Sequence, residues 1–155
     1  MDTLVFQLGG QRFGVAAYDV VELLPAVSVT PLPRAPAIVE GVINVRGQLV
    51  PVLDIRSRFG LEERPVRHSD HYVVAKAGKR VVAVRADRAL DLVHVPGEAL
   101  IDATEAVPAS PYIKGVAKLP DGLVLLHDLH AFLTSAEEAS LDAAFESAAL
   151  EGADG

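Results

Sequence analysis

The chain contains a weak copy of itself. Residues 38–59 lie without gaps over residues 112–133, so that "VEGV" matches "IKGV" and Asp54-Ile55 matches Asp128-Leu129 at one constant offset. A looser match at an offset near 69 places Glu22-Leu23 over Asp91-Leu92. A repeat of about 70 residues is too long for a solenoid unit and fits a small five-stranded barrel. The sequence therefore predicts two related β-barrels that share one core.

Short valine-rich runs between turn residues support a mainly β fold. Half of the 155 residues are apolar but only 5% are aromatic, so the core must be built from aliphatic side chains, and the abundance of valine favours strands. Tight hairpin turns are expected at Gly9-Gly10, Gly78-Lys79 and Asp121-Gly122, because these residues tolerate positive φ.

The repeat divides the chain into a domain over residues 1–135, with intertwined barrel subdomains whose repeat halves span 4–60 and 72–133. Between the halves, "LEERPVRHSD" reads as an exposed connection. Asp54 and Asp128 are expected to cap one helical turn each. Residues 135–155 are predicted to form an amphipathic helix and an acidic tail, with Ser135 and Glu138 as a capping box.

Charge and composition exclude several classes of protein. The net charge is −7, of which residues 135–155 supply six acids and no Lys or Arg, so nothing resembles the basic face that nucleic acid requires. There are no cysteines, which excludes thiolate chemistry. The start, "MDTLVFQLGG", has neither a basic region nor a long apolar run, so no signal peptide and no direct membrane insertion are expected.

No motif for catalysis or for a cofactor is present, since the chain lacks a GxSxG elbow, a P-loop and a GxGxxG opening a helix. The histidines of His68-x-x-His71 and His127-Asp128-x-His130 have a spacing that suits a metal if a third ligand joins them. A ligand- or metal-binding β-barrel therefore stays open as an alternative to a protein without cofactor or metal.

The run "IVEGVINVRGQLVPVLDIRSRFGL" closely resembles the signature of the CheW-like family of bacterial chemotaxis coupling proteins. "LVFQLGGQRFGVAAYDVVELL", "GKRVVAVRADRALDLVHV" and "YIKGVAKLPDGLVLLHDLHAFL" extend the resemblance over residues 4–133. The resemblance implies two five-stranded SH3-like subdomains and a non-enzymatic adaptor. It would bridge the cytoplasmic tips of methyl-accepting chemoreceptors to the regulatory domain of the CheA histidine kinase, in the cytoplasm at receptor arrays. A decoy coupling protein that lacks the kinase contact is a second alternative.

The resemblance also implies a set of contact residues. Arg46 matches the family arginine implicated in receptor coupling, and Asn44 belongs to the same motif. Gly41 and Gly47 match family glycines but are also what a strand entrance and a tight turn require. Glu22 is expected to hold Arg46 by a bidentate contact. Val20 and Leu92, placed at equivalent positions of the two halves, are expected to hold a receptor helix in a groove between the barrels. The full candidate set is Val20, Glu22, Gly41, Asn44, Arg46, Gly47 and Leu92.

Overall fold

The computed structural model describes residues 1–102 and 111–154, and within them the chain is mainly β, as predicted. The strands are β1 (Asp2–Leu8), β2 (Gln11–Ala16), β3 (Val20–Pro25), β4 (Val39–Val45), β5 (Gln48–Leu53), β6 (His71–Ala77), β7 (Arg80–Ala86), β8 (Arg88–His94), β9 (Leu100–Asp102), β10 (Ile113–Leu119) and β11 (Gly122–His127). Single 3₁₀ turns are η1 (Ala17–Asp19), η2 (Arg56–Phe59), η3 (Gly97–Ala99) and η4 (Leu129–Ala131), and the chain closes with α2 (Ser135–Asp154).

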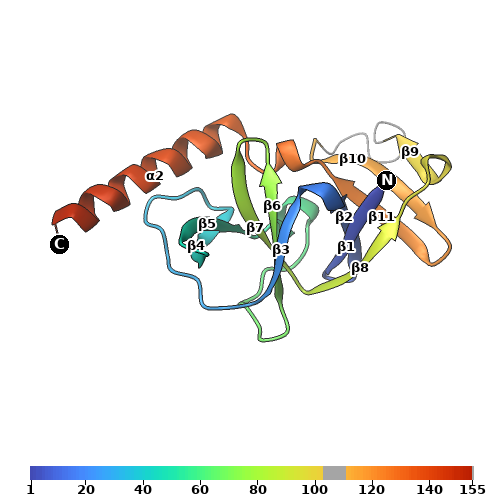
Figure 1. Cartoon of the computed structure of the whole chain (residues 1–155), viewed down its shortest axis with the longest axis horizontal. Coiled ribbons are helices and arrows are strands. Elements are labelled where there is room, and N and C mark those ends of the chain that lie inside the picture. The colour runs from blue at the N-terminus through green and yellow to red at the C-terminus, as the bar shows by residue number, and fades with distance from the viewer. Residues whose placement is uncertain (103–110, 155) are drawn as a thin grey trace.

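The strands form two sheets, one for each subdomain. A five-stranded sheet has the order β3-β6-β7-β5-β4, and a six-stranded sheet has the order β8-β1-β2-β11-β10-β9. In Figure 1 the five-stranded sheet and α2 lie on the left and the six-stranded sheet lies on the right. The sixth strand was not expected; it is the short β9, which pairs with β10 through three residues.

The internal repeat is confirmed in the backbone. β4 and β10 keep the offset of the first sequence match at both of their ends, as do β5 and β11, and β1 and β6 keep that of the looser match. Even the irregularities repeat, since a bulge follows the first residue of both β4 and β10. The parallel pairing of Val52 with Ala83 recurs as that of Leu126 with Gly14. The two sheets are therefore versions of one structure.

Each sheet is assembled from both halves of the repeat. The hairpin β1–β2, from the first half, pairs with β11 of the second half, while β6–β7 of the second half pairs with β3 and β5 of the first. Each sheet therefore contains the first hairpin of the opposite repeat half, and this exchange is how the two subdomains are intertwined.

The core has three parts. Each subdomain has its own small apolar cluster, and the members of the two clusters are repeat equivalents. Val50 and Val52 in one subdomain correspond to Val124 and Leu126 in the other. A larger cluster lies between the sheets and contains Phe6, Phe13, Leu53, Val73, Phe132 and Leu141. This shared core, predicted from the repeat, holds the two subdomains together.

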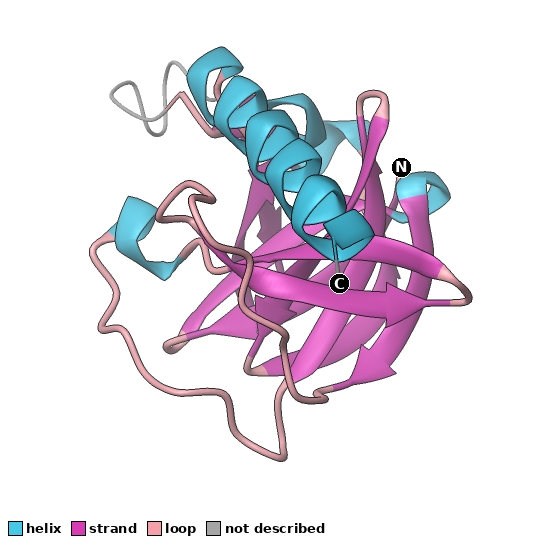
Figure 2. Ribbon diagram, turned by 90° about the vertical axis from the view of Figure 1, so that its left-hand side faces the viewer, coloured by secondary structure: helices cyan, strands magenta, loops and turns pink. Residues whose placement is uncertain are grey.

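Helix α2 covers the five-stranded subdomain. Leu141 and Ala144 are fully buried, Phe145 is half-buried, and Figure 2 shows the helix lying across the strands. The expected capping box is one residue out of place: the N–H of Glu137 donates to Oγ1 of Thr134, and the N–H of Thr134 donates to Oε1 of Glu137. The predicted acidic tail is helical through Asp154.

Two of the three predicted hairpin turns lie where the sequence places them. The hairpins at Gly9-Gly10 and Gly78-Lys79 are confirmed, whereas the third turn lies at Pro120-Asp121, because Gly122 already belongs to β11. Asp128 caps η4 as expected, accepting from the N–H of His130. The cap expected at Asp54 is wrong, because the N-cap of η2 is Ile55, although Oδ1 of Asp54 accepts from the N–H of Arg56.

The connection over residues 61–70 is not merely exposed. Asp70 is fully buried, and Arg64 pairs with it through two hydrogen bonds. These residues belong to a network of three arginines and four acids at the junction of the two sheets. The members are Glu40, Asp54, Arg56, Arg64, Asp70, Arg85 and Asp87.

Burial and hydrogen bonds shift the pKa of three acids of the network, in different directions. Burial raises the pKa of the Asp70 carboxyl, but hydrogen bonds from Arg64 and from the N–H of Arg67 outweigh it, so that this pKa lies below its ordinary value. The pKa of Asp87 is lowered in the same way, against its burial, by the N–H of Gly9 and by Arg56. For Glu40, burial prevails over Arg85 and the pKa is raised.

Candidate functional site

The tip of the β4–β5 hairpin carries the arginine that the sequence singles out. Arg46 and Gly47 are its two central residues, and both have positive φ, 54° and 86°. This is the backbone of a type I′ turn, which favours Asn and Gly, so Arg46 bears a conformational cost. Oδ1 of Asn44 accepts from the N–H of Gly47 at 2.7 Å and holds the turn.

Arg46 pairs with Glu22, as predicted, but by one contact instead of two among the described residues. Nη2 of Arg46 lies 3.3 Å from Oε1 of Glu22, so the bidentate geometry that we expected is wrong. The side chain of Arg46 is 81% exposed, against 24% for Glu22. A single exposed contact stabilises a fold very little, so most of the guanidinium is free to meet a partner.

Gly41 does not lie among the exposed residues at the hairpin tip. It is buried, has a φ of 155°, and a Cβ placed on it would lie 2.3 Å from the carbonyl oxygen of Thr30. Thr30 and Val42 exchange backbone hydrogen bonds, so the strand needs glycine at Gly41 for this close approach. Its repeat equivalent Gly115 is less confined, with its nearest neighbour, the oxygen of Ile101, at 3.4 Å.

Val20 and Leu92 lie in different sheets. Val20 opens β3 and packs in part against the shared core, whereas Leu92 on β8 is 65% exposed. The expected equivalence is wrong: Leu92 pairs with Leu4 of β1 and therefore corresponds to Leu23, which pairs with Val73 of β6.

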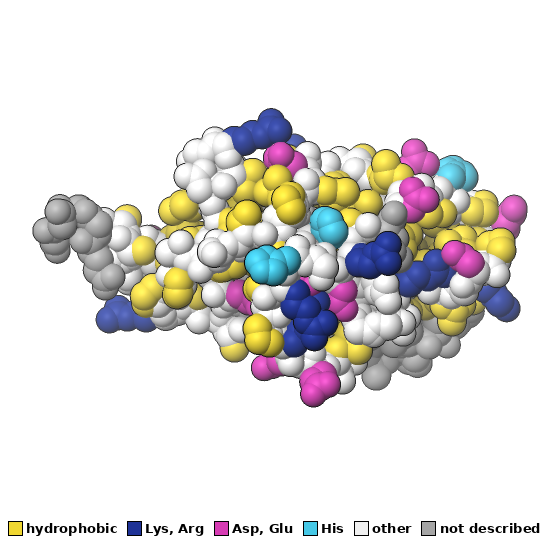
Figure 3. Space-filling model, turned by 90° about the horizontal axis from the view of Figure 1, so that it is seen from below, with side chains coloured by type: hydrophobic (Ala, Val, Ile, Leu, Met, Phe, Trp, Pro, Cys, Tyr) yellow, Lys and Arg dark blue, Asp and Glu magenta, His cyan; other side chains and the backbone are white. Residues whose placement is uncertain are grey.

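Sequence reasoning missed exposed apolar side chains on β3. Val21 and Leu23 are 52% and 43% exposed, on the face of β3 that alternates with half-buried Glu22. The repeat match of Leu23 with Leu92, which was already a candidate contact residue, could have identified Leu23. β3 and β8 are edge strands of the two sheets, so each sheet presents an exposed leucine at an edge. Figure 3 shows hydrophobic side chains mixed with acidic, basic and histidine side chains on the face seen from below.

The histidines of the alternative metal site are not gathered. His127 is fully buried against Phe132, with ring centroids 4.1 Å apart, and its Nδ1 bonds the carbonyl oxygen of Asp128. Burial lowers the pKa of His127 to about 4. Among the described residues there is no group of three or more His, Cys, Asp or Glu side chains placed to hold a metal ion.

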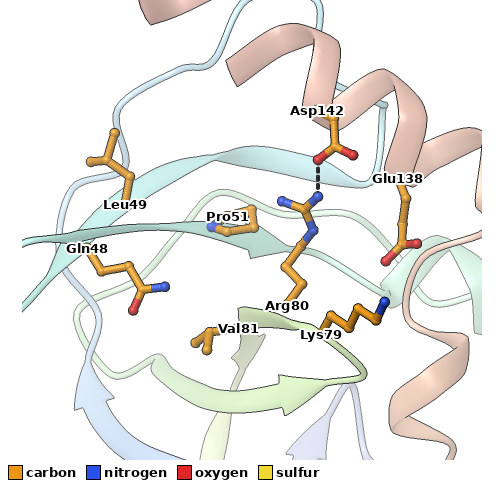
Figure 4. A pocket seen from close by; sticks show the side chains of 8 residues that line it. All are labelled: Gln48, Leu49, Pro51, Lys79, Arg80, Val81, Glu138 and Asp142. Atoms are coloured by element: carbon orange, nitrogen blue, oxygen red, sulfur yellow. Dashed lines mark hydrogen bonds and ion pairs between the residues drawn. The ribbon is translucent and has the colours of Figure 1, made fainter. Parts of the chain in front are cut away.

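Helix α2 lies beside the β4–β5 hairpin. Arg80 of β7 forms an ion pair with Asp142 of α2, across a cavity of about 420 Å³ that Leu49 also lines (Figure 4). Arg58 pairs with Glu137 nearer the start of the helix. Within the part of the chain that the structure describes, no helix is both long and apolar enough to cross a membrane.

Comparisons with known proteins agree with this architecture. Residues 2–137 match the model of the CheW-like domain family. The chain is 29% identical over 141 residues to the chemotaxis protein CheW of Klebsiella aerogenes, covering 90% of this chain and 85% of that protein. It is 31% identical over 141 residues to the chemotaxis protein CheW of Rhizobium meliloti, covering 88% and 89%.

A solved structure has the same fold. The crystal structure of the scaffolding protein TtCheW from Thermoanaerobacter tengcongensis superimposes with a TM-score of 0.79 at 24% identity, covering 88% of this chain and 94% of that one. With the family model matching residues 2–137, the chain belongs to the CheW-like family of chemotaxis coupling proteins.

Proposed function

We propose that this chain is a non-catalytic adaptor that couples methyl-accepting chemoreceptors to the CheA histidine kinase. Its domain over residues 1–135 would contact the cytoplasmic tips of the receptors and the regulatory domain of the kinase, and it would work in the cytoplasm at receptor arrays.

One observation carries the proposal. Arg46 is exposed, holds a backbone conformation that costs an arginine free energy, and makes a single weak contact with Glu22 within the described part of the chain. Folding alone gains nothing from an arginine there, and strained, exposed residues of this kind are found at binding sites. Membership of a coupling-protein family supplies the class of partner.

The proposed contact surface consists of Glu22, Asn44, Arg46 and Gly47 at the hairpin, with Val20 and Leu92 on the edge strands. Glu22 orients the guanidinium, and Asn44 holds the turn that presents it. Gly41 contributes by allowing the close approach of Thr30 to the strand, and so acts on the surface only through the fold.

The test is capture of the chain by a receptor-tip fragment and by the kinase regulatory domain, each immobilised separately. Arg46→Glu should abolish receptor capture, because it reverses the charge and places two acids together at the tip. The matched control is Arg67→Glu, which reverses another exposed arginine, in the 61–70 connection. Receptor capture that is indifferent to Arg46→Glu would overturn the role given to Arg46, and failure of the unaltered chain to bind either partner would overturn the adaptor proposal.

A further inference from the structure

Asp87 stands where the chain passes from one subdomain to the other. It is the single residue between the end of β7 in the five-stranded sheet and the start of β8 in the six-stranded sheet. How this residue is held therefore contributes, beside the shared core, to the position of β8 relative to the five-stranded sheet.

Its carboxylate and its backbone are bound from both sides. From the six-stranded sheet, the N–H of Gly9 donates to Oδ2 at 2.7 Å, and the carbonyl oxygen of Gln7 accepts from the N–H of Asp87 at 2.8 Å. From the other side, Arg56 of η2 and Arg64 of the connection both donate to Oδ1. One side chain thus joins the β1–β2 turn, η2 and the 61–70 connection.

The two arginines have little freedom to move. Arg56 is 1% exposed, and its Nη1 also contacts Oδ1 of Asp54 at 3.1 Å. Arg64 is held in addition by the fully buried Asp70. Removing one partner of a buried ion pair leaves the other charge uncompensated, so these contacts resist displacement.

The repeat shows that the fold does not require this joint. In the looser repeat match, the position of Asp87 corresponds to that of Tyr18, whose side chain is 81% exposed. Arg85 corresponds to Ala16 in the same way, and the crossing there is made by the 3₁₀ turn η1. Both crossings lie within the described part of the chain, and only one of them is fastened by buried charges.

We propose that Asp87 is a positioning residue that fixes the separation between the two apolar edge strands, β3 and β8. Leu23 on β3 and Leu92 on β8 are the repeat-related exposed leucines, one on each sheet. A receptor helix that contacts both needs the two strands at a constant distance, whereas a partner that contacts one sheet does not. This inference rests on the proposed receptor contact.

The geometric test uses Asp87→Asn in the full chain, with Asp54→Asn as the matched control. Asp54 is a network acid of similar burial that contacts Arg56 and Arg85 and, among the described residues, makes no hydrogen bond to the six-stranded sheet. Because the chain has no cysteine, Lys76→Cys and Lys118→Cys allow one spin label on each sheet. Double electron–electron resonance should show a broadened distance distribution in Asp87→Asn and an unchanged one in Asp54→Asn.

The functional test measures binding to the two immobilised partners. If only a tenth of Asp87→Asn molecules hold the right separation at any time, receptor affinity falls about tenfold, because the apparent affinity scales with the competent fraction. A partner that contacts one sheet alone should keep its affinity within about twofold by the same relation. Should Asp87→Asn fail to fold, Arg64→Gln removes the Arg64 contacts while keeping those of Gly9 and Arg56.

The outcomes separate the two proposals. An unaltered chain that captures no receptor fragment sinks the proposed receptor contact. An unaltered chain that captures it, with Asp87→Asn or Arg64→Gln giving either a sharp distance distribution or undiminished capture, refutes the positioning role of Asp87 alone. Equal losses in Asp54→Asn would count against it as well.

Discussion

Arg46 and Pro120 occupy the same turn position in the two repeat-related hairpins, β4–β5 and β10–β11. Proline fixes φ near −65°, whereas Arg46 has a φ of 54°. The two turns therefore differ in conformation although their strands superimpose in register. The first hairpin keeps a costly backbone at the place where it presents an arginine.

Replacing Arg46 by asparagine should stabilise the fold and impair the function. Asn-Gly is the preferred pair for a type I′ turn, so Arg46→Asn should raise the free energy of unfolding by about 0.5–1 kcal/mol. Urea denaturation checks the stability, and receptor capture should fall in the same preparation. A variant that is less stable than the unaltered chain would contradict the strain assigned to Arg46.

Gly41→Ala should act on folding and leave binding by the folded molecules intact. Its Cβ would lie 2.3 Å from the oxygen of Thr30, so the strand or the 29–33 segment must shift, at a cost of about 2 kcal/mol or more. Gly115→Ala is the control, with 3.4 Å to its nearest neighbour, and should cost less. Comparable melting temperatures for the two variants would argue against this explanation of Gly41.

His127 should make the fold sensitive to mild acid. Its pKa is lowered by burial to about 4 in the folded state, against an ordinary value of 6.5. The unfolded chain therefore takes up a proton that the folded chain refuses, and stability is lost as the pH falls from 6.5 towards 4. The loss between pH 7.5 and pH 5 should be about 2 kcal/mol.

The control for His127 is built into the repeat. Leu53 occupies the equivalent position in the other half and is fully buried, so His127→Leu should fold and lose most of this pH dependence. Urea denaturation of both proteins at the two pH values measures the difference. Parallel slopes in the two proteins would assign the acid sensitivity to other groups.

Arg85→Leu should strongly lower the free energy of unfolding. Arg85 is 1% exposed and faces Glu40, Asp54 and Asp70. Without it Asp54 would keep Arg56 and Asp70 would keep Arg64, whereas Glu40 makes no other ion pair within the described residues. Breaking a buried network in this way costs about 3–5 kcal/mol. Arg80→Leu, on the same strand, removes a partly exposed pair with Asp142 and should cost less than about 1 kcal/mol. Thermal unfolding that ranks the two in the opposite order would contradict the importance of the network.

The repeat predicted the strands well because glycine and aspartate mark their ends in both halves. Gly41 and Gly115 are aligned near the starts of β4 and β10, and Asp54 and Asp128 directly follow the ends of β5 and β11. Gly122 misled the placement of the third turn, because a glycine next to a turn and a glycine inside it look alike in sequence.

The charged network escaped prediction for a physical reason. Asp70 and Arg64 lie in a polar segment without apolar periodicity, and such segments are usually solvated, whereas these two residues neutralise each other at a junction formed by distant strands. Pairing between side chains from separate elements cannot be read from local pattern. The pairing of Arg46 with Glu22 could be predicted only from the family resemblance. Its geometry, with a single contact, could not be predicted from the sequence.

The exchange of hairpins has a consequence for synthesis of the chain. β2 pairs along one side with β11, through Phe13 with Leu125 and Gly14 with Leu126, so the first hairpin made is completed by the last strand of the described residues. Until then β2 presents an open edge, and pairing partners so distant in sequence form slowly. Neither sheet can close during translation of the first half, and the nascent chain must be kept from aggregating until the ribosome has passed β11.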